Sequence, residues 1–215
     1  MIGTFTMLSS FLNCEHAMYR RYIKRDLGPY VQSKEAKWGD DIHVAMQRRI
    51  GSKTPLPDTM RQWECFAVPF DGKIPLVEQQ LAITRQGKAT GYWDKDAWFR
   101  GKADCVIVEG ERAYFLDWKS GKSNYEDPFE LETGALLLRA KRPQIKTVVG
   151  SYAWLKENRI GTLYDLSDFD GTWNRIKELM GQIEAKKPEE FVKHKSGLCG
   201  WCSVKDCENH YVARK

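Results

Sequence analysis

The stretch KADCVIVEGERAYFLDWKS, residues 102–120, decides the fold, because it predicts two long strands joined by a tight turn. Gly110 and Glu111 are the two residues of that turn, and glycine at the first central position suits a two-residue hairpin. Counting back from the turn along both strands places Asp104 directly opposite Asp117. Opposed residues of an antiparallel pair are near neighbours, so we expect these two acids to lie close together.

Both faces of the predicted hairpin are mostly apolar. One face carries Val106, Val108, Ala113 and Phe115, and the other carries Cys105, Ile107, Tyr114, Leu116 and Trp118. A strand pair that is apolar on both sides is typical of the interior of a sheet covered by other elements on both faces. We therefore expect helices above and below this hairpin.

The two opposed acids have a chemical consequence. Carboxylates facing each other on a buried surface repel and lose hydration, and a divalent cation between them relieves both costs. Oxygen ligands favour Mg²⁺ or Mn²⁺. Lys119 lies two residues beyond Asp117 on the same face, where it can reach a phosphate or an attacking water. The alternative is a structural Asp–Lys pair at a strand end.

Flanking segments alternate between helical and extended patterns. Helical patterns cover 5–26, 33–50, 127–143 and 167–187, and extended patterns cover 77–84, 145–155 and 161–166. This order predicts an α/β fold with a mixed central sheet flanked by helices. No repeat interrupts it.

Bulk composition restricts the class of protein. The chain has 215 residues, of which 42% are hydrophobic and 29% charged, which is enough to bury a core. The net charge of +5 permits a polyanionic partner such as nucleic acid. No apolar run is long enough to predict a membrane span, and the N-terminus does not resemble a secretory leader. We therefore expect a cytoplasmic location, in which thiols stay reduced.

Three cysteines are clustered near the C-terminus. Cys199, Cys202 and Cys207 have the spacing x2 and x4, which in a reducing compartment indicates metal or cluster ligation. Two ligand sets are open. Zinc would take the three thiolates with His210, whereas a [4Fe–4S] cluster would take a fourth cysteine, for which Cys14 is the candidate.

Other residues carry weaker signals. His43 lies on a helical stretch, where a lone histidine is more often a packing or surface residue than a ligand, although imidazole binds Mn²⁺ readily. For Glu78, at the start of a strand, the ordinary expectation is a solvated charge. Cys65 and Cys105 are expected to be small buried residues of strands.

Taken in order, five motifs resemble one known family over nearly the whole chain. They are LSSFLNCEHAMYRRYI (8–23), GDDIHVAM (39–46), GKADCVIV (101–108), LDWKSGK (116–122) and LCGWCSVKDC (198–207). Together they resemble the RecB-type branch of the PD-(D/E)xK nuclease superfamily, in particular its iron–sulfur CRISPR-associated and phage-encoded exonucleases. Each motif is weak alone, and their joint occurrence in this order carries the resemblance.

The resemblance implies a restriction-endonuclease-like core and a set of roles. His43, Asp104 and Asp117 would hold the metal together with the backbone carbonyl of Trp118, and Lys119 would act in catalysis beside the two aspartates. The resemblance also implies that Cys14, Cys199, Cys202 and Cys207 bind a [4Fe–4S] cluster. Residues 1–215 would form a single nuclease domain, in which 1–26 and 188–215 make a cluster-binding clasp.

The chain departs from the family pattern at three places. Glu15 replaces the usual proline after the first cysteine, and the last two cysteines are separated by x4 where x5 is commoner. The family's Q-x-x-x-Y motif would fall on ELETG, so that Glu130 and Gly134 replace the glutamine and the tyrosine. Glu130 is therefore a candidate, but altered, contact to the DNA backbone.

These inferences predict a function. We expect a divalent-metal-dependent DNA nuclease, an exonuclease that acts on single strands or on DNA ends, with Trp93 and Trp98 as exposed aromatic contacts to the strand. DNA is the expected partner, together with a recombination or repair protein, in the host cytoplasm if the gene is carried by a phage. The alternative is a DNA-binding module with a vestigial active site and a zinc or iron–sulfur clasp.

Overall fold

The computed structural model describes residues 1–29, 32–123 and 126–211. The chain divides into two compact units: unit 1 comprises Met1–Ile2 and Gln32–Asn174, and unit 2 comprises Gly3–Val31 and Arg175–Lys215. The assignment of 1–215 to one nuclease domain, with a clasp of 1–26 and 188–215, stays a prediction, and residues 212–215 lie outside the described ranges. No helix in the described ranges has the length and apolar run needed to span a bilayer.

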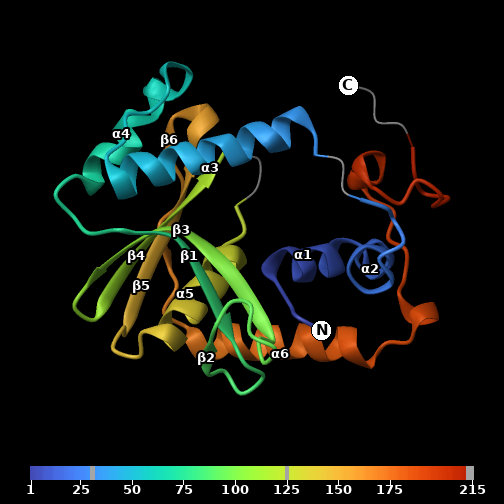
Figure 1. Cartoon of the computed structure of the whole chain (residues 1–215). Helices are drawn as coiled ribbons and strands as arrows, with labels where there is room; N and C mark the ends of the chain where they lie inside the picture. Colours follow the sequence, from blue (N-terminus) through green and yellow to red (C-terminus); the bar gives the residue numbers. More distant parts are fainter. Residues whose placement is uncertain (30–31, 124–125, 212–215) are drawn as a thin grey trace. The chain divides into compact units, whose positions relative to one another are not determined.

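Unit 1 is built on one sheet of seven strands (Figure 1). The strands are β1 (Leu76–Ile83), β2 (Ala89–Thr90), β3 (Phe99–Glu109), β4 (Arg112–Lys119), β5 (Thr147–Trp154), β6 (Arg159–Ile160) and β7 (Tyr164–Asp165). Their order is β2-β1-β3-β4-β5-β6, and β7 also pairs with β5. Only the β4–β5 pair is parallel among these strands. The predicted mixed sheet is confirmed.

The predicted hairpin of β3 and β4 is also confirmed. Cys105 lies opposite Leu116, as the count from the turn requires, and Gly110 has the positive φ of 61° that a mirror-image hairpin turn demands. The regular ladder stops there. The next side chain, Asp104, accepts a hydrogen bond at Oδ2 from the backbone N–H of Trp118, over 2.9 Å. The Asp104 side chain thus replaces a backbone carbonyl as acceptor for the Trp118 N–H at the point where the regular pairing of β3 and β4 ends.

Helices cover the two faces of the sheet, as expected. On one face, α3 (Lys34–Ser52) and α4 (Glu64–Ala67) form a buried cluster with residues of β3 and β4 that include Cys105 and Trp118. The opposite face, marked by Phe115, faces α5 (Phe129–Lys141), where a Cβ on Gly134 would lie 3.0 Å from the Phe115 ring. The strands are therefore apolar on both sides because each side packs on a helix.

Local sequence explains where the helices of unit 1 begin. The hydroxyl of Ser33 accepts from the N–H of Ala36 over 3.1 Å and caps α3. The carboxylate of Asp127 accepts from the N–H of Phe129 over 3.0 Å at the start of α5. The connection from β4 through α5 to the parallel strand β5 is the crossover that such a pair requires.

Unit 2 joins an N-terminal and a C-terminal segment. It contains α1 (Phe5–Asn13), α2 (Glu15–Met18), the π-helix η1 (Tyr19–Lys24), the C-terminal part of α6 (Phe169–Ala185), and the short 3₁₀ segments η5 (Pro188–Glu190) and η6 (Gly197–Trp201). The prediction of one continuous helix over 5–26 is wrong, because Cys14 is extended, with φ −163°. The hydroxyl of Thr4 caps the first piece by accepting from the N–H of Met7 over 3.2 Å.

Polar contacts tie the two segments of unit 2 together. Glu15 accepts at Oε2 from Nζ of Lys186 over 2.7 Å and from the N–H of Val192 over 3.1 Å. The rings of Tyr19 and Phe191 stack with centroids 4.8 Å apart. Glu15 therefore links the N-terminal and C-terminal segments of unit 2.

Candidate active site

Three side chains converge at the Asp104 end of the sheet in unit 1. Nδ1 of His43 lies 3.3 Å from Oδ2 of Asp104 and 3.6 Å from Oε1 of Glu78. Within the described part of the chain, these residues form the one group of three or more His, Cys, Asp or Glu ligand atoms that all lie within 4.8 Å of one another. A nitrogen and two carboxylate oxygens at this spacing can hold a metal ion.

Backbone geometry brings Glu78 into this group. The ladder of β1 and β3 pairs Val77 with Cys105 and Gln79 with Ala103 but omits Glu78, whose φ is +48°. A positive φ is uncommon for a residue other than glycine, and such strain is found preferentially at functional sites. The expectation of a solvated charge is wrong, since only 19% of the Glu78 side chain is exposed.

Two motif glycines allow the close packing that places His43 and Asp104. Gly39 lies one turn before His43, and a Cβ there would lie 3.1 Å from Oγ of Ser120, just beyond β4. Gly101 lies in β3, and a Cβ there would be 3.1 Å from Cδ1 of Leu137 in α5. Larger residues at either position would push the helix away from the strand that carries the acids.

The other predicted residues meet beside this group. Nζ of Lys119 lies 2.7 Å from Oδ1 of Asp117 and 2.7 Å from Oε2 of Glu130, and 5.1 Å from the centroid of the Tyr152 ring. The Trp118 ring packs behind them, 2% exposed. Glu130, predicted only as a candidate DNA contact, therefore also holds the lysine in place.

Charge and burial shift the proton affinities of these groups. Burial would lower the pKa of His43, but hydrogen bonds to Asp104 and Glu78 outweigh it and raise that pKa to about 10. Burial, reinforced by the charge of Asp104, raises the pKa of Asp117 to about 8. The pKa of Lys119 is raised, since Asp117 and Glu130 outweigh the effect of its burial. The carboxylates of this site therefore carry more negative charge than His43 and Lys119 neutralise.

A divalent cation suits this arrangement. Oδ1 of Asp117 is buried, and among the described residues it has no donor in hydrogen-bonding geometry, although the Lys119 ammonium lies near it. A buried carboxylate oxygen that is paired with one ammonium at 2.7 Å and lies beside a His/Glu/Asp group can also serve as a ligand atom for a hard cation. Asp117 is not itself part of the group whose ligand atoms lie within 4.8 Å. Of the predicted metal ligands, the structure thus groups His43 with Asp104, and it adds Glu78, which the sequence did not predict as a ligand.

A cavity of about 590 Å³ adjoins the end of β4. Its lining includes Ser120 and Gly121, which follow Lys119, together with Trp38, Trp63 and Lys156. Trp38 is 41% exposed. The proposed site residues do not line this cavity, which lies at the segment that follows β4.

The two predicted aromatic contacts differ in exposure. Trp93 is 75% exposed, as expected, and the guanidinium carbon of Arg100 lies 4.7 Å from the centroid of its ring. The expected exposure of Trp98 is wrong: it is 7% exposed and its ring meets that of Trp173 edge-on, with centroids 5.5 Å apart. Of these two residues, Trp93 is exposed to solvent, whereas Trp98 packs on the core.

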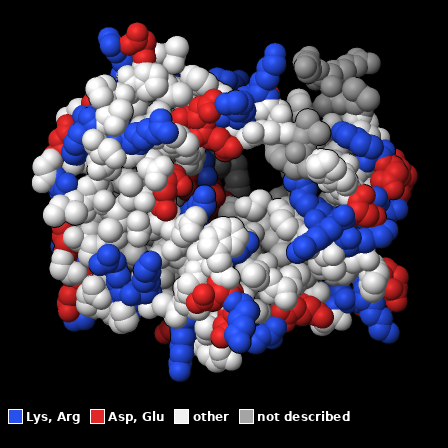
Figure 2. All heavy atoms as spheres, viewed as in Figure 1, with Lys and Arg blue, Asp and Glu red and all other residues white. Residues whose placement is uncertain are grey.

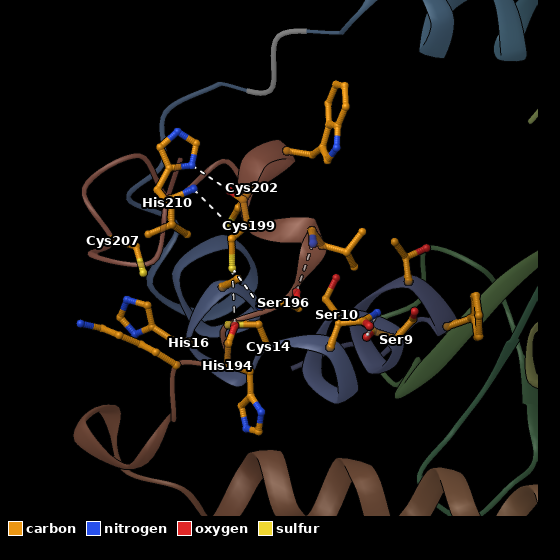
Figure 3. Close-up of a pocket in the computed structure, with 18 residues that line it drawn as sticks. Ser9, Ser10, Cys14, His16, His194, Ser196, Cys199, Cys202, Cys207 and His210 are labelled. Atoms are coloured by element: carbon orange, nitrogen blue, oxygen red, sulfur yellow. Dashed lines mark hydrogen bonds between the residues drawn. The ribbon is translucent and has the colours of Figure 1, made fainter. Parts of the chain in front are cut away.

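All four predicted cluster cysteines line one cavity of unit 2, of about 300 Å³ (Figure 3). The six cysteines of the chain are free. Two of the sulfurs already accept backbone hydrogen bonds, Cys199 from Ser196 N over 3.3 Å and Cys202 from Val204 N over 3.4 Å. N–H donors of this kind stabilise thiolates that bind iron.

The cysteine sulfurs do not form a compact group. A tetrahedral zinc site with Zn–S bonds of about 2.3 Å would hold its sulfurs about 3.8 Å apart. Among the described residues, Cys199, Cys202 and Cys207 do not form a group within 4.8 Å, alone or with a histidine. Nδ1 of His210, the fourth ligand of the zinc alternative, is 2.8 Å from the carbonyl oxygen of Cys199. The cysteine sulfurs therefore lie further apart than the sulfurs around a single zinc ion.

Comparisons with known proteins bear on the fold. The chain matches no protein-family model, and no curated protein matches it. Among solved structures it is similar to the protein SSO0001, with 12% identity and a TM-score of 0.52 over 95% of this chain and 86% of that one. It is also similar to a protein of Eubacterium rectale provisionally described as an exonuclease, with 13% identity and a TM-score of 0.57 over 100% of this chain and 90% of that one. At these identities the likeness shows a shared α/β fold.

Proposed function

We propose that this protein is a divalent-metal-dependent DNA nuclease, an exonuclease that acts on single strands or DNA ends. The observation that carries the proposal is the convergence of His43, Glu78 and Asp104 next to the pair of Asp117 and Lys119. The shared fold with a protein provisionally described as an exonuclease supports it.

Each residue has a defined task in this proposal. Mg²⁺ or Mn²⁺, held by His43, Glu78, Asp104 and Asp117 with the carbonyl of Trp118, would lower the pKa of a bound water and neutralise phosphate charge. Lys119, fixed by Glu130, directs its ammonium at the phosphate or the attacking water. Trp93 offers a ring on which a base stacks.

We further propose that Cys14, Cys199, Cys202 and Cys207 bind a [4Fe–4S] cluster. Each thiolate of such a cluster binds a different iron, so the sulfurs must lie further apart than around one zinc ion. The common cavity and the two N–H···S bonds suit metal-bound thiolates, and the spread of the sulfurs beyond 4.8 Å supports a cluster over a single zinc ion. The expected reducing environment of the cytoplasm would keep these thiols available.

Lys119→Ala tests the nuclease proposal. With Mn²⁺ and end-labelled single-stranded DNA, we expect cleavage to fall by at least about 100-fold, the range typical of a lost catalytic group. Lys122→Ala is the matched control, since Lys122 is an exposed lysine three residues further along the chain. Its activity should stay within about threefold of the unaltered protein.

Two outcomes would contradict the proposal. Undiminished cleavage by Lys119→Ala would show that another site performs the reaction. DNA binding without cleavage by the unaltered protein in Mg²⁺, Mn²⁺ and other divalent metals would instead identify a DNA-binding module with a vestigial active site.

A further inference from the structure

A second cavity in unit 2, of about 580 Å³, has a basic and aromatic lining. Its polar and aromatic members are Arg21, Arg25, Trp201, Ser203 and Lys205. Of the described residues that line it, none is acidic. Figure 2 shows Lys and Arg side chains gathered over the region of α2 and η1 within this unit. A cavity with several cations and no acid favours an anionic ligand.

The acids that follow these cations along the chain are neutralised elsewhere. Asp26 follows Arg25, and Asp206 follows Lys205, yet Arg20 binds both carboxylates, at 2.6 Å and 3.0 Å. Within the described ranges, neither Arg25 nor Lys205 takes part in an ion pair. Their charges are therefore available to a ligand.

The cavity also has a defined frame. Nη2 of Arg21 donates to Oγ of Ser203 over 2.7 Å, which joins the N-terminal segment to the C-terminal one at the cavity wall. This hydrogen bond restrains the Arg21 side chain in the lining that it shares with Lys205. Ordered cations bind a charged ligand at a lower entropic cost than mobile ones.

Trp201 completes the lining. It is 69% exposed, ends η6 and also lines the neighbouring cavity of the cysteines. An exposed indole held by a short ordered segment is poorly explained by packing, since it buries little. Next to cations, it matches the pattern by which proteins bind single strands: phosphates meet the cations and a base stacks on the ring.

We propose that this cavity is a second binding site for single-stranded DNA, with Arg25 and Lys205 on phosphates and Trp201 against a base. Single strands fit better than duplex, because the bases of a duplex are stacked on each other and leave no free face for the indole. The choice of DNA as ligand rests on the proposed nuclease function. The site would hold the strand on unit 2 while unit 1 carries the cleavage residues.

The test measures binding without cleavage. The full chain, in EDTA, is titrated into a fluorescent oligothymidylate and followed by anisotropy. Trp201→Ala is expected to weaken binding roughly 5- to 100-fold, the range for one lost base stack, and Trp201→Phe, which keeps a ring, to weaken it less. The double variant Arg25→Ala/Lys205→Ala should reduce the slope of log K against log salt by about 1.4, or about 0.7 per lost phosphate contact.

A matched double variant controls for net charge. Lys177→Ala/Lys187→Ala removes the same charge from exposed positions of unit 2 outside the cavity and should leave the salt slope nearly unchanged. Melting temperatures equal to that of the unaltered protein show that each variant is folded. Unchanged affinity of Trp201→Ala, or equal salt slopes for the two double variants, would overturn the site. If Trp201→Ala binds DNA more weakly than the unaltered protein, and the unaltered protein cleaves no DNA in any divalent metal, the binding site is supported and the nuclease function is refuted.

Discussion

Replacing Asp117 by asparagine should stabilise the metal-free protein, although it removes a proposed catalytic residue. Asp117 is buried, its Oδ1 is paired with the Lys119 ammonium at 2.7 Å and has no other hydrogen-bond partner among the described residues, and the charge of Asp104 lies nearby. Asparagine has nearly the shape of the protonated acid and carries no charge. Lys119 keeps Glu130 as a partner at 2.7 Å, so the substitution does not leave a buried cation alone.

The magnitude follows from the raised pKa. The pKa of Asp117 rises from 3.8 to about 8 in the folded protein, so the folded state binds the proton more tightly than the unfolded chain does. Stability due to this group is therefore full below about pH 4, falls as the pH rises toward 8, and changes little above it. At pH 7.5 the loss is at most about 5 kcal/mol. Because 14% of the side chain is exposed, we expect roughly 2 to 4 kcal/mol.

The assay is thermal and urea unfolding in EDTA, followed by tryptophan fluorescence. At pH 7.5 the melting temperature of Asp117→Asn should exceed that of the unaltered protein by about 5 to 10 °C, and at pH 5 the difference should shrink. Adding Mn²⁺ should then stabilise the unaltered protein by more than it stabilises Asp117→Asn, which keeps His43, Glu78 and Asp104 but loses one proposed ligand. Asp96→Asn, at an exposed position, is the control and should show neither effect.

One result would refute this reasoning about the site. If Asp117→Asn melts at or below the temperature of the unaltered protein at pH 7.5 in EDTA, the ion pair with Lys119 stabilises the fold by more than the acids destabilise it. The pair would then be structural, as a strand-end Asp–Lys pair often is.

Three further predictions follow from other contacts. Glu78→Gln should weaken Mn²⁺ binding at least about tenfold in isothermal titration, and equal affinity would remove Glu78 from the site. Glu126 accepts hydrogen bonds from the N–H of Thr162 over 2.9 Å, from Nε1 of Trp154 over 2.7 Å and from the hydroxyl of Tyr164 over 3.1 Å. Burial would raise its pKa, but these bonds lower it to about 2. Glu126→Gln should thus cost roughly 2 kcal/mol in urea unfolding at pH 7, a difference that fades as the pH falls below 4.5. Cys14→Ala should abolish the cluster absorption at about 400 nm and lower the melting temperature; unchanged melting would contradict a structural cluster.

The hairpin could be predicted because its determinants are local. A glycine at the turn fixed the register, and the two-residue period of a strand then fixed which side chains share a face. The same reasoning failed for Glu78, because its position depends on how β1 pairs with β3 and on a positive φ that no neighbouring residue signals. A glutamate in the long strand that precedes the G-x-x-D strand along the chain is the signal that could have found it.

Tertiary packing accounts for the other differences. Trp98 lies in a polar stretch that suggests exposure, yet it is buried against Trp173, which is distant in the sequence. Cys65 was expected in a buried strand and is exposed in α4, whereas Cys105 is fully buried, as predicted. The break at Cys14 interrupts a pattern whose helical period continues on both sides. None of these three features is caused by neighbouring residues in the sequence, so the local sequence pattern could not predict them.

Charge balance decides between a structural ion pair and a metal site. The described residues around Lys119 include four carboxylates, those of Glu78, Asp104, Asp117 and Glu130, against two cations, Lys119 and protonated His43. The difference is two negative charges when Asp117 is ionised and one when it holds the proton that its raised pKa favours. A structural pair would need only one acid for the lysine, and natural cores seldom hold surplus buried charge. A divalent cation supplies the missing charge and displaces the His43 proton, so metal affinity should rise with pH, which a purely structural pair does not require.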